Sequence, residues 1–233
     1  MSQGLYEGVA AMHSAERRME AIASNLANMG VHGFKRRSMA TNAFDVVLRG
    51  QVQRQLGTRI VVDHGQGTLV QSDGQYDLAL AGAGYFAVET ERGEAYTRNG
   101  QFRVDDAGVL QTHEGYPVAW EGPRGTLDPT GLPVLIDPEG RVQQGTDELG
   151  KLRIVDFAQS DALVQDRRGY YHAQGRAQEV PHRASVRQGL LETANVNAVD
   201  EMVAMISAQR SFESATRLMQ MIDQTYRRLN SLR

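Results

Sequence analysis

The chain ends in MISAQRSFESATRLMQMIDQTYRRLN, Met205 to Asn230, a long stretch that carries apolar residues at helical spacing. Small or apolar residues recur there at alternating steps of three and four, which is the spacing of one face of an α-helix. Chain ends without partners fray, so a stripe this close to the end predicts a helix that packs against another element. The stripe comprises Met205, Ala208, Phe212, Ala215, Met219, Ile222, Tyr226 and Leu229.

The N-terminus carries a second stripe with the same alternation, and charged residues such as Glu16 and Arg17 lie off it. Alanine and glycine on both stripes let helices approach closely, and methionine fills irregular gaps. The two stripes therefore predict long terminal helices that pair as a coiled-coil-like domain, and an ordinary core helix at each end is the alternative. The N-terminal stripe comprises Leu5, Gly8, Met12, Ala15, Met19, Ile22, Leu26 and Met29.

Residues at the ends of both helices fit the preferences for capping. We expect Ser2 to cap the first helix, which Gly30 or Gly33 then ends. Asn197 is the expected cap of the last helix, with the acidic Asp200 and Glu201 in the first turn, where the helix dipole favours them. At about 1.5 Å per residue the two helices would span roughly 40 and 50 Å.

Between the helices the hydrophobic pattern changes to period two with frequent turn signals. Asn99-Gly100 is a strong hairpin signal, and Asp106 to Gly108 and Glu114-Gly115 mark further turns of a β meander. The sequence thus predicts an α+β fold with a central, mainly β domain. The expected division is a terminal-helix domain of residues 1–36 and 188–233, a connecting segment of residues 37–59 and a β domain of residues 60–187.

Composition excludes several classes of protein. With 25 Lys and Arg against 28 Asp and Glu, the chain has no basic excess to bind nucleic acid. It has no cysteine, which excludes disulfides, iron–sulfur clusters, thiolate zinc sites and thiol nucleophiles. No apolar run approaches the roughly 18 residues of a membrane span, and the N-terminus lacks the pattern of a cleaved signal peptide.

The candidate catalytic motifs in the sequence each lack a residue or a spacing that their chemistry requires. Gly82 to Ala87, GAGYFA, lacks the third glycine and the following helix of a dinucleotide loop, so we interpret it as a turn before a strand. The six histidines are scattered without the spacing of metal ligands, and Asp105-Asp106 lies on a predicted turn. We predict no catalytic, cofactor-binding or metal-binding residues, hence no enzyme. The basic run from Lys35 to Arg37 is expected to form a solvated or subunit-facing loop.

Four stretches together resemble one family. Residues 23–37, ASNLANMGVHGFKRR, resemble the signature that closes the N-terminal helix in the bacterial flagellar rod and hook family. YDLALAGAGYFAV and AYTRNGQFRVDDAGVL look like that family's central β motifs, and VRQGLLETANVNAVDEMVAMISAQRSFE looks like its entry into the C-terminal helix. Gly30, Val31 and His32 depart from the small polar residues usual after the first half of the signature. The signature residues are Asn25, Leu26, Ala27, Asn28, Gly33, Phe34 and Lys35.

The resemblance implies a structural subunit of the flagellar basal-body rod, the drive shaft that transmits torque to the hook. Such subunits pair their terminal helices around a central channel and assemble with copies of themselves and with other rod subunits. They are exported unfolded by the flagellar type III apparatus to the periplasmic rod, without a cleaved signal peptide, and they need no cofactor. The expected assembly seam comprises Leu5, Met12, Met19, Ile22, Leu26, Met205, Phe212, Met219, Ile222, Tyr226 and Leu229.

The short stretch from Phe34 to Gly82 favours the proximal over the distal type of rod subunit within this family. A distal rod subunit or a hook-type axial subunit is the alternative within the family. The alternative from another class is a ligand-binding or enzymatic β domain with helical oligomerisation arms. A deep pocket with convergent ionisable groups would favour that last reading.

Overall fold

The computed structural model describes residues 2–48, 51–166, 168–175 and 177–231. The side chains of Leu5, Tyr226 and Leu229, three members of the predicted stripes, lie outside the described residues. The chain is α+β, with a helix at each end and a β-rich region between them, which confirms the predicted fold class. It divides into two compact units. The helical unit comprises Met1–Asn28, Arg36–Asp63 and Val196–Arg233, and the β unit comprises Met29–Lys35 and His64–Asn195.

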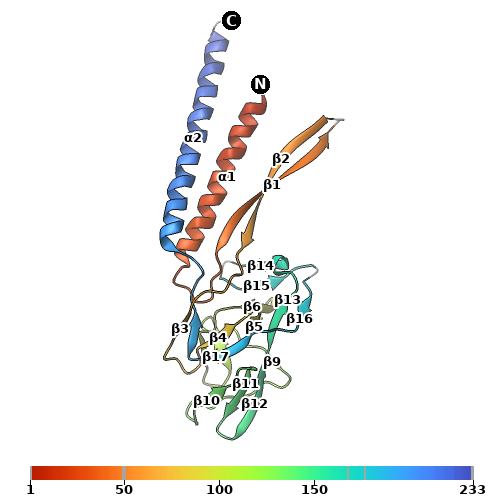
Figure 1. Ribbon diagram of the computed structural model, residues 1–233, viewed down its shortest axis with the longest axis vertical. Helices are drawn as coiled ribbons and strands as arrows, with labels where there is room; N and C mark the ends of the chain where they lie inside the picture. The colour runs from red at the N-terminus through yellow and green to blue at the C-terminus, as the bar shows by residue number, and fades with distance from the viewer. Residues whose placement is uncertain (1, 49–50, 167, 176, 232–233) are drawn as a thin grey trace. The chain divides into compact units, whose positions relative to one another are not determined.

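The helical unit pairs the two ends of the chain. Helices α1, Ser2–Ala27, and α2, Ala198–Ser231, pack side by side and antiparallel, so both termini lie at the same end of the pair (Figure 1). Strands β1, Arg37–Leu48, and β2, Gln51–Val62, form an antiparallel hairpin whose first strand contacts α1. This hairpin occupies the stretch for which the sequence suggested a connecting segment.

The start of α2 follows the sequence prediction. The Oδ1 atom of Asn197 accepts a hydrogen bond of 3.0 Å from the backbone N–H of Val199, as an N-cap does. Asp200 and Glu201 occupy the first turn. Helix α1 ends at Ala27. The side chain of Ser2, the expected cap of this helix, lies outside the described residues.

All strand pairs among the described residues of the β unit are antiparallel. One sheet has the strand order β14-β15-β6-β5-β13-β16, another has the order β10-β11-β12-β9, and three strand pairs are β17-β4, β18-β3 and β7-β8. The strands are β3 Leu69–Gln71, β4 Leu78–Ala81, β5 Tyr85–Thr90, β6 Gly93–Thr97, β7 Phe102–Val104, β8 Leu110–Thr112, β9 Trp120–Glu121, β10 Val134–Ile136, β11 Arg141–Gln144, β12 Asp147–Leu152, β13 Ile154–Phe157, β14 Leu163–Gln165, β15 Tyr171–Ala173, β16 Glu179–Val180, β17 Ser185–Gln188 and β18 Leu190–Glu192.

The core of the β unit lies where strands from several sheets meet. Strands β4 and β5 are buried at consecutive positions, since both of their faces are covered, whereas β8 and β10 bury alternate residues. Fully buried core side chains include Leu78, Leu80, Phe86, Val88, Val118 and Leu152. Residues from distant parts of the chain thus form one hydrophobic core in the β unit.

The predicted hairpin at Asn99-Gly100 is wrong. Strand β6 pairs with β5 and β15, whereas β7 pairs with β8, so this segment joins two different sheets. Side chains satisfy the backbone of the turn: Thr97 Oγ1 accepts from the N–H of Asn99, and Asn99 Oδ1 accepts from the N–H of Gln101. The local signal for a turn was real, but the flanking strands pair with partners that only the tertiary fold supplies.

Two other turn predictions are confirmed. Gly82 and Gly84 have φ of 109° and 147°, which side chains other than glycine rarely adopt, and β5 begins at the next residue, Tyr85. Asp105 Oδ1 accepts hydrogen bonds from two backbone N–H groups that follow it, those of Ala107 and Val109. Both motifs therefore shape the chain, as the sequence indicated.

Candidate functional site

Helices α1 and α2 pack against each other, and two contacts show how they are aligned. Asn25 Nδ2 donates a hydrogen bond of 3.1 Å to Glu201 Oε2, and a Cβ atom on Gly8 would lie 2.5 Å from Met219 Sδ. These two contacts fix an antiparallel register near both ends of α1. The register brings large residues level with small ones, namely Met12 with Ala215, Ala15 with Phe212 and Met19 with Ala208.

Burial follows this register. The small residues of the stripes are buried, and so is Ile22, whereas the larger ones are half-buried. Met29 at the end of the N-terminal stripe is exposed and belongs to the β unit. The described members of the predicted seam that are half-buried are Met12, Met19, Leu26, Met205, Phe212, Met219 and Ile222.

The first half of the signature fixes the end of α1 within the helical unit. Asn25 is fully buried, and its amide group makes two 2.8 Å hydrogen bonds with the backbone of Arg37, donating to the C=O and accepting from the N–H. Glu201 is also fully buried and accepts a 2.5 Å bond from Arg36 Nε. Asn28 donates to the C=O of Ser24 one turn earlier. The buried carboxylate is thus compensated by an amide and a guanidinium.

The second half of the signature belongs to the β unit, where Lys35 is fully buried. Its ammonium group donates to Glu192 Oε1 at 2.5 Å and to the C=O of Gly65 at 2.7 Å. Glu192, fully buried as well, also accepts from Arg98 Nη1 at 3.2 Å and from the N–H of Gly67 at 2.8 Å. The prediction of a solvated loop is therefore wrong for Lys35, because a buried carboxylate and a carbonyl replace water around its charge.

Gly33 and Phe34 complete this attachment. Gly33 has a φ of 69°, and a Cβ there would collide with the backbone of Arg98. Its N–H donates to the C=O of Glu192 at 2.7 Å, while the C=O of Phe34 accepts from the N–H of Asn195 at 3.4 Å. Phe34 is only 4% exposed. The turn at Gly30, Val31 and His32, which departs from the small polar residues expected there, is closed by a hydrogen bond from the N–H of Phe34 to the C=O of Val31.

Sequence reasoning missed the partners of the signature. Glu201 was interpreted only through the helix dipole, and Glu192 and Arg98 were given no role. The available signal was an acid directly after two leucines in Leu190-Leu191-Glu192, since a charge in an apolar strand requires a compensating cation. Nothing local to Glu192 names Lys35, which lies 157 positions earlier in the chain.

The β unit also has a recess of about 240 Å³ lined by polar groups. Tyr85 Oη and His64 Nδ1 lie 2.6 Å apart there, and burial raises the pKa of Tyr85 to about 12, so the phenol stays protonated at neutral pH. Arg98 lines the recess but its Nη atoms are engaged with Glu192 and with the carbonyls of Leu80 and Gly82. These contacts hold structure together rather than present a reactive group.

Two further features of the described residues bear on other functions. Within the described ranges, no group of three or more His, Asp or Glu side chains is placed to hold a metal ion. No helix of the described chain is both long enough and apolar enough to cross a membrane.

Comparisons with known proteins match all three parts of this architecture. Residues 5–35 match the family described as Flagella basal body rod protein, residues 79–144 match Flagellar hook protein FlgE/F/G D1 domain, and residues 187–232 match Flagellar basal body rod FlgEFG protein C-terminal. The flagellar basal-body rod protein FlgF of Caulobacter vibrioides is 31% identical over 227 residues, covering 94% of this chain and 93% of the relative. The chain belongs to the flagellar basal-body rod protein family.

Rod proteins of a second type are also similar over their whole length. The flagellar basal-body rod protein FlgG of Bacillus subtilis is 29% identical over 271 aligned residues, covering 100% of both chains. FlgG of Caulobacter vibrioides is 28% identical over 266 residues, covering 99% of both. Residues 25–35 contribute to a buried charge network in each unit. Asn25 contacts Glu201 in the helical unit, and Lys35 contacts Glu192 in the β unit.

Proposed function

We propose that this protein is a structural subunit of the flagellar basal-body rod, which assembles with copies of itself and with other rod subunits into the axial shaft that transmits torque to the hook. Membership of the rod protein family over nearly the whole chain is the observation that carries the proposal. The buried charge networks support it, because their ionisable groups pair with one another inside each unit and so stabilise the fold.

The paired terminal helices are the proposed assembly domain. We infer that α1 and α2 form a coiled-coil-like pair in the rod, with residues of the predicted seam inside the pair. The alternation of large and small residues across the register supports this, since small residues let two helices approach closely. Gly8 against Met219 is its clearest example.

We infer that this chain is a proximal rod subunit, the type named FlgF, rather than a distal one, the type named FlgG. The alignment with FlgF of Caulobacter vibrioides spans 227 residues, close to the 233 of this chain, whereas the alignments with FlgG span 266 and 271 and require insertions. Within Caulobacter vibrioides, the identity is 31% to FlgF and 28% to FlgG. The short segment between the signature and β5 supports the same assignment.

The proposal extends to the route by which the protein reaches the rod. We infer export by the flagellar type III apparatus without cleavage of a signal peptide, to the periplasmic part of the basal body, and no enzymatic activity or cofactor.

The experiment is the purification of basal bodies from a strain whose only copy carries an epitope tag. The tagged protein should copurify with the basal body, imaging should place the tag on the rod near the membrane, and deletion of the gene should abolish motility. A matched strain with the tag on an unrelated periplasmic protein controls for contamination. Absence of the protein from basal bodies of motile cells would refute the proposal, and a tag at the hook end of the rod would refute the proximal assignment alone.

A further inference from the structure

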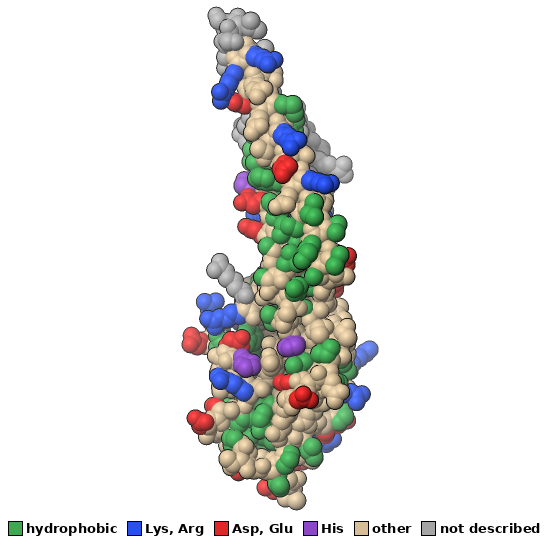
Figure 2. Space-filling model, turned by 90° about the vertical axis from the view of Figure 1, so that its left-hand side faces the viewer, with side chains coloured by type: hydrophobic (Ala, Val, Ile, Leu, Met, Phe, Trp, Pro, Cys, Tyr) green, Lys and Arg blue, Asp and Glu red, His purple; other side chains and the backbone are tan. Residues whose placement is uncertain are grey.

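Strand β10, Val134–Ile136, lies at one edge of the sheet that has the order β10-β11-β12-β9 (Figure 1). Its first and last residues are buried in the core. The neighbouring side chains of Leu132 and Leu135 are 65% and 64% exposed. Figure 2 shows hydrophobic side chains at the surface of the end of the β unit that holds β10 to β12. The stretch LPVLI, residues 132–136, has no charged residue, and an apolar edge without charges is a site at which another chain can add a strand.

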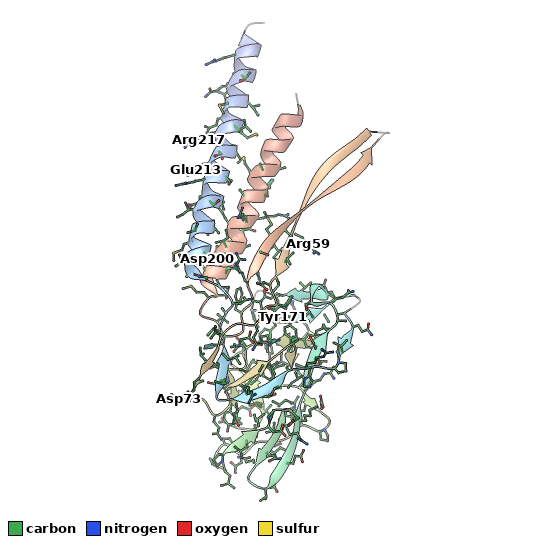
Figure 3. The ribbon with its side chains drawn as sticks, viewed as in Figure 1. Arg59, Asp73, Tyr171, Asp200, Glu213 and Arg217 are labelled. Carbon is green, nitrogen blue, oxygen red and sulfur yellow. The ribbon has the colours of Figure 1, made fainter. Side chains whose placement is uncertain are left out.

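The side chain of Gln188 occupies this edge of β10. Its Nε2 donates a hydrogen bond of 2.8 Å to the C=O of Val134, and its Oε1 accepts one of 3.0 Å from the N–H of Ile136. A side-chain amide has the donor and the acceptor of a peptide group, so these two bonds resemble those that a neighbouring strand would make with β10. Nε2 also donates at 2.8 Å to the C=O of Gln75, in the loop between β3 and β4 that Asp73 marks in Figure 3.

Strand β17 lies beside β10 and holds Gln188 in this place. The N–H of Val186 on β17 donates at 2.9 Å to the C=O of Pro138, just beyond the end of β10. On its other side β17 pairs with β4, with Gln188 opposite Leu78. The strand pair β17-β4 and the sheet that contains β10 are thus joined at this edge through the side chain of Gln188 and the backbone of Val186.

We propose that Gln188 holds the edge of β10 closed against a second copy of the chain, which would otherwise pair with it edge to edge. In an antiparallel pair of two β10 strands centred on Leu135, the N–H of Ile136 in each copy donates to the C=O of Val134 in the other. These are the two groups that Gln188 occupies. The pairing would also bring the two exposed Leu135 side chains opposite each other, where they shield each other from water.

The contact between two such edges is isologous, because the same strand serves both copies. Strand addition of this kind draws its affinity from main-chain hydrogen bonds, so the groups that decide it are the C=O of Val134 and the N–H of Ile136. As long as both are bonded to Gln188, a second copy finds neither of them open. Gln188 has this role in the folded β unit whether or not the chain assembles into a rod.

A single introduced thiol can report the pairing, because the chain has no cysteine. Full-length protein with Leu135→Cys is compared with the double variant Leu135→Cys, Gln188→Ala in glutathione disulfide, and the disulfide-linked dimer is measured by non-reducing electrophoresis. The two residues at the centre of the pairing would have Cα atoms about 4.5 Å apart, within the range of a disulfide. We expect several-fold more dimer from the double variant, because alanine removes the amide that closes the edge.

Two variants control for the loss of an amide and for the position of the thiol. Gln143 is exposed on β11 opposite Leu135, and Gln143→Ala leaves Gln188 in place. Combined with Leu135→Cys, it should give no more dimer than Leu135→Cys alone. Leu132 is as exposed as Leu135 but lies away from the centre of the proposed pairing. Leu132→Cys combined with Gln188→Ala should therefore give several-fold less dimer than Leu135→Cys with Gln188→Ala.

Amide hydrogen exchange shows whether alanine opens the edge of a β unit that stays folded. Gln188 protects the N–H of Ile136, so Gln188→Ala should speed its exchange by at least about tenfold. The N–H of Asp137, which donates to the C=O of Arg141, should keep its protection. If Asp137 loses protection as well, Gln188→Glu takes the place of Gln188→Ala. The carboxylate keeps the length of the side chain and its acceptor but lacks the donors, so this variant should also increase the dimer.

Equal amounts of dimer from Leu135→Cys with and without the change at residue 188 would overturn the proposal, even if the amide of Ile136 exchanges faster. Dimer formation that is as strong through Leu132→Cys would also overturn it, because contact would then not depend on the register of β10. Fast exchange of the Ile136 amide in the unmodified protein would show that Gln188 does not close the edge.

Discussion

Replacement of Lys35 by methionine tests whether the signature is an internal part of the β unit. Methionine keeps most of the length of the side chain and removes its charge. Glu192 then loses the closest of its partners but keeps Arg98 and the N–H of Gly67. Removing one partner of a buried ion pair costs about 3–5 kcal/mol, and the remaining partners place Lys35→Met near the lower limit.

Urea unfolding followed by fluorescence measures this loss in the β unit alone. The chain has a single tryptophan, and Trp120 is buried in the core of that unit. With a denaturant dependence of about 1–3 kcal/mol per M, a loss of 3 kcal/mol lowers the urea midpoint by at least about 1 M. The matched control is Arg36→Met, which removes the next cation along the chain but breaks a pair within the helical unit.

The control should leave the midpoint of Trp120 fluorescence nearly unchanged. In the double variant Lys35→Met with Glu192→Gln, the total loss should fall short of the sum of the single losses by about 0.5–3 kcal/mol, because the two side chains interact directly. A midpoint for Lys35→Met equal to that of the unmodified protein, or additive losses in the double variant, would show that the buried pair does not stabilise the β unit.

The remaining predictions concern a glycine, the helix pair and a buried tyrosine. Gly33→Ala should destabilise the β unit by more than about 1 kcal/mol because of its positive φ and the collision with Arg98, whereas Gly30→Ala has open space and should be neutral in the same urea assay. Met219→Lys should abolish motility while the exported protein keeps a folded β unit, and Gln220→Lys on the exposed face should be milder; normal motility of Met219→Lys would contradict the seam. Because the pKa of Tyr85 is raised from 10.0 to about 12, only the unfolded state loses its proton between these values, so stability should fall as pH rises from 10 to 12, and Tyr85→Phe should reduce the fall.

The terminal helices were predictable because their information is local. A stripe at helical spacing, a cap at Asn197 and acidic residues in the first turn all depend on neighbours within a few positions. The β region was predictable as a class for the same reason, since alternation and turn residues are also local. Strand pairing was not, as Asn99-Gly100 shows, because β6 pairs with β15 from far along the chain.

The signature at residues 25–35 was recognised from the sequence, but the partners of its side chains were not. Its glycine and asparagines indicated a turn, yet their function depends on distant acids, Glu192 for one half and Glu201 for the other. A run of three basic residues usually lies in solvent, so the sequence predicted a solvated or subunit-facing loop for Lys35. The burial of a charge is decided by its compensating partner, and that partner cannot be identified from one sequence without the fold.

The division of Lys35 and Arg36 between two buried carboxylates has a consequence for how the chain tolerates changes in length. Gly33 is held by its close approach to Arg98 and Lys35 by Glu192, so the spacing between these two residues is fixed. A residue added directly after Gly33 would place Phe34 where Lys35 meets Glu192, and a residue removed there would place Arg36 at that point. Loop insertions elsewhere usually cost little, because closing a slightly longer loop is entropically cheap. Between Gly33 and Lys35 the number of residues is therefore constrained as well as their identity.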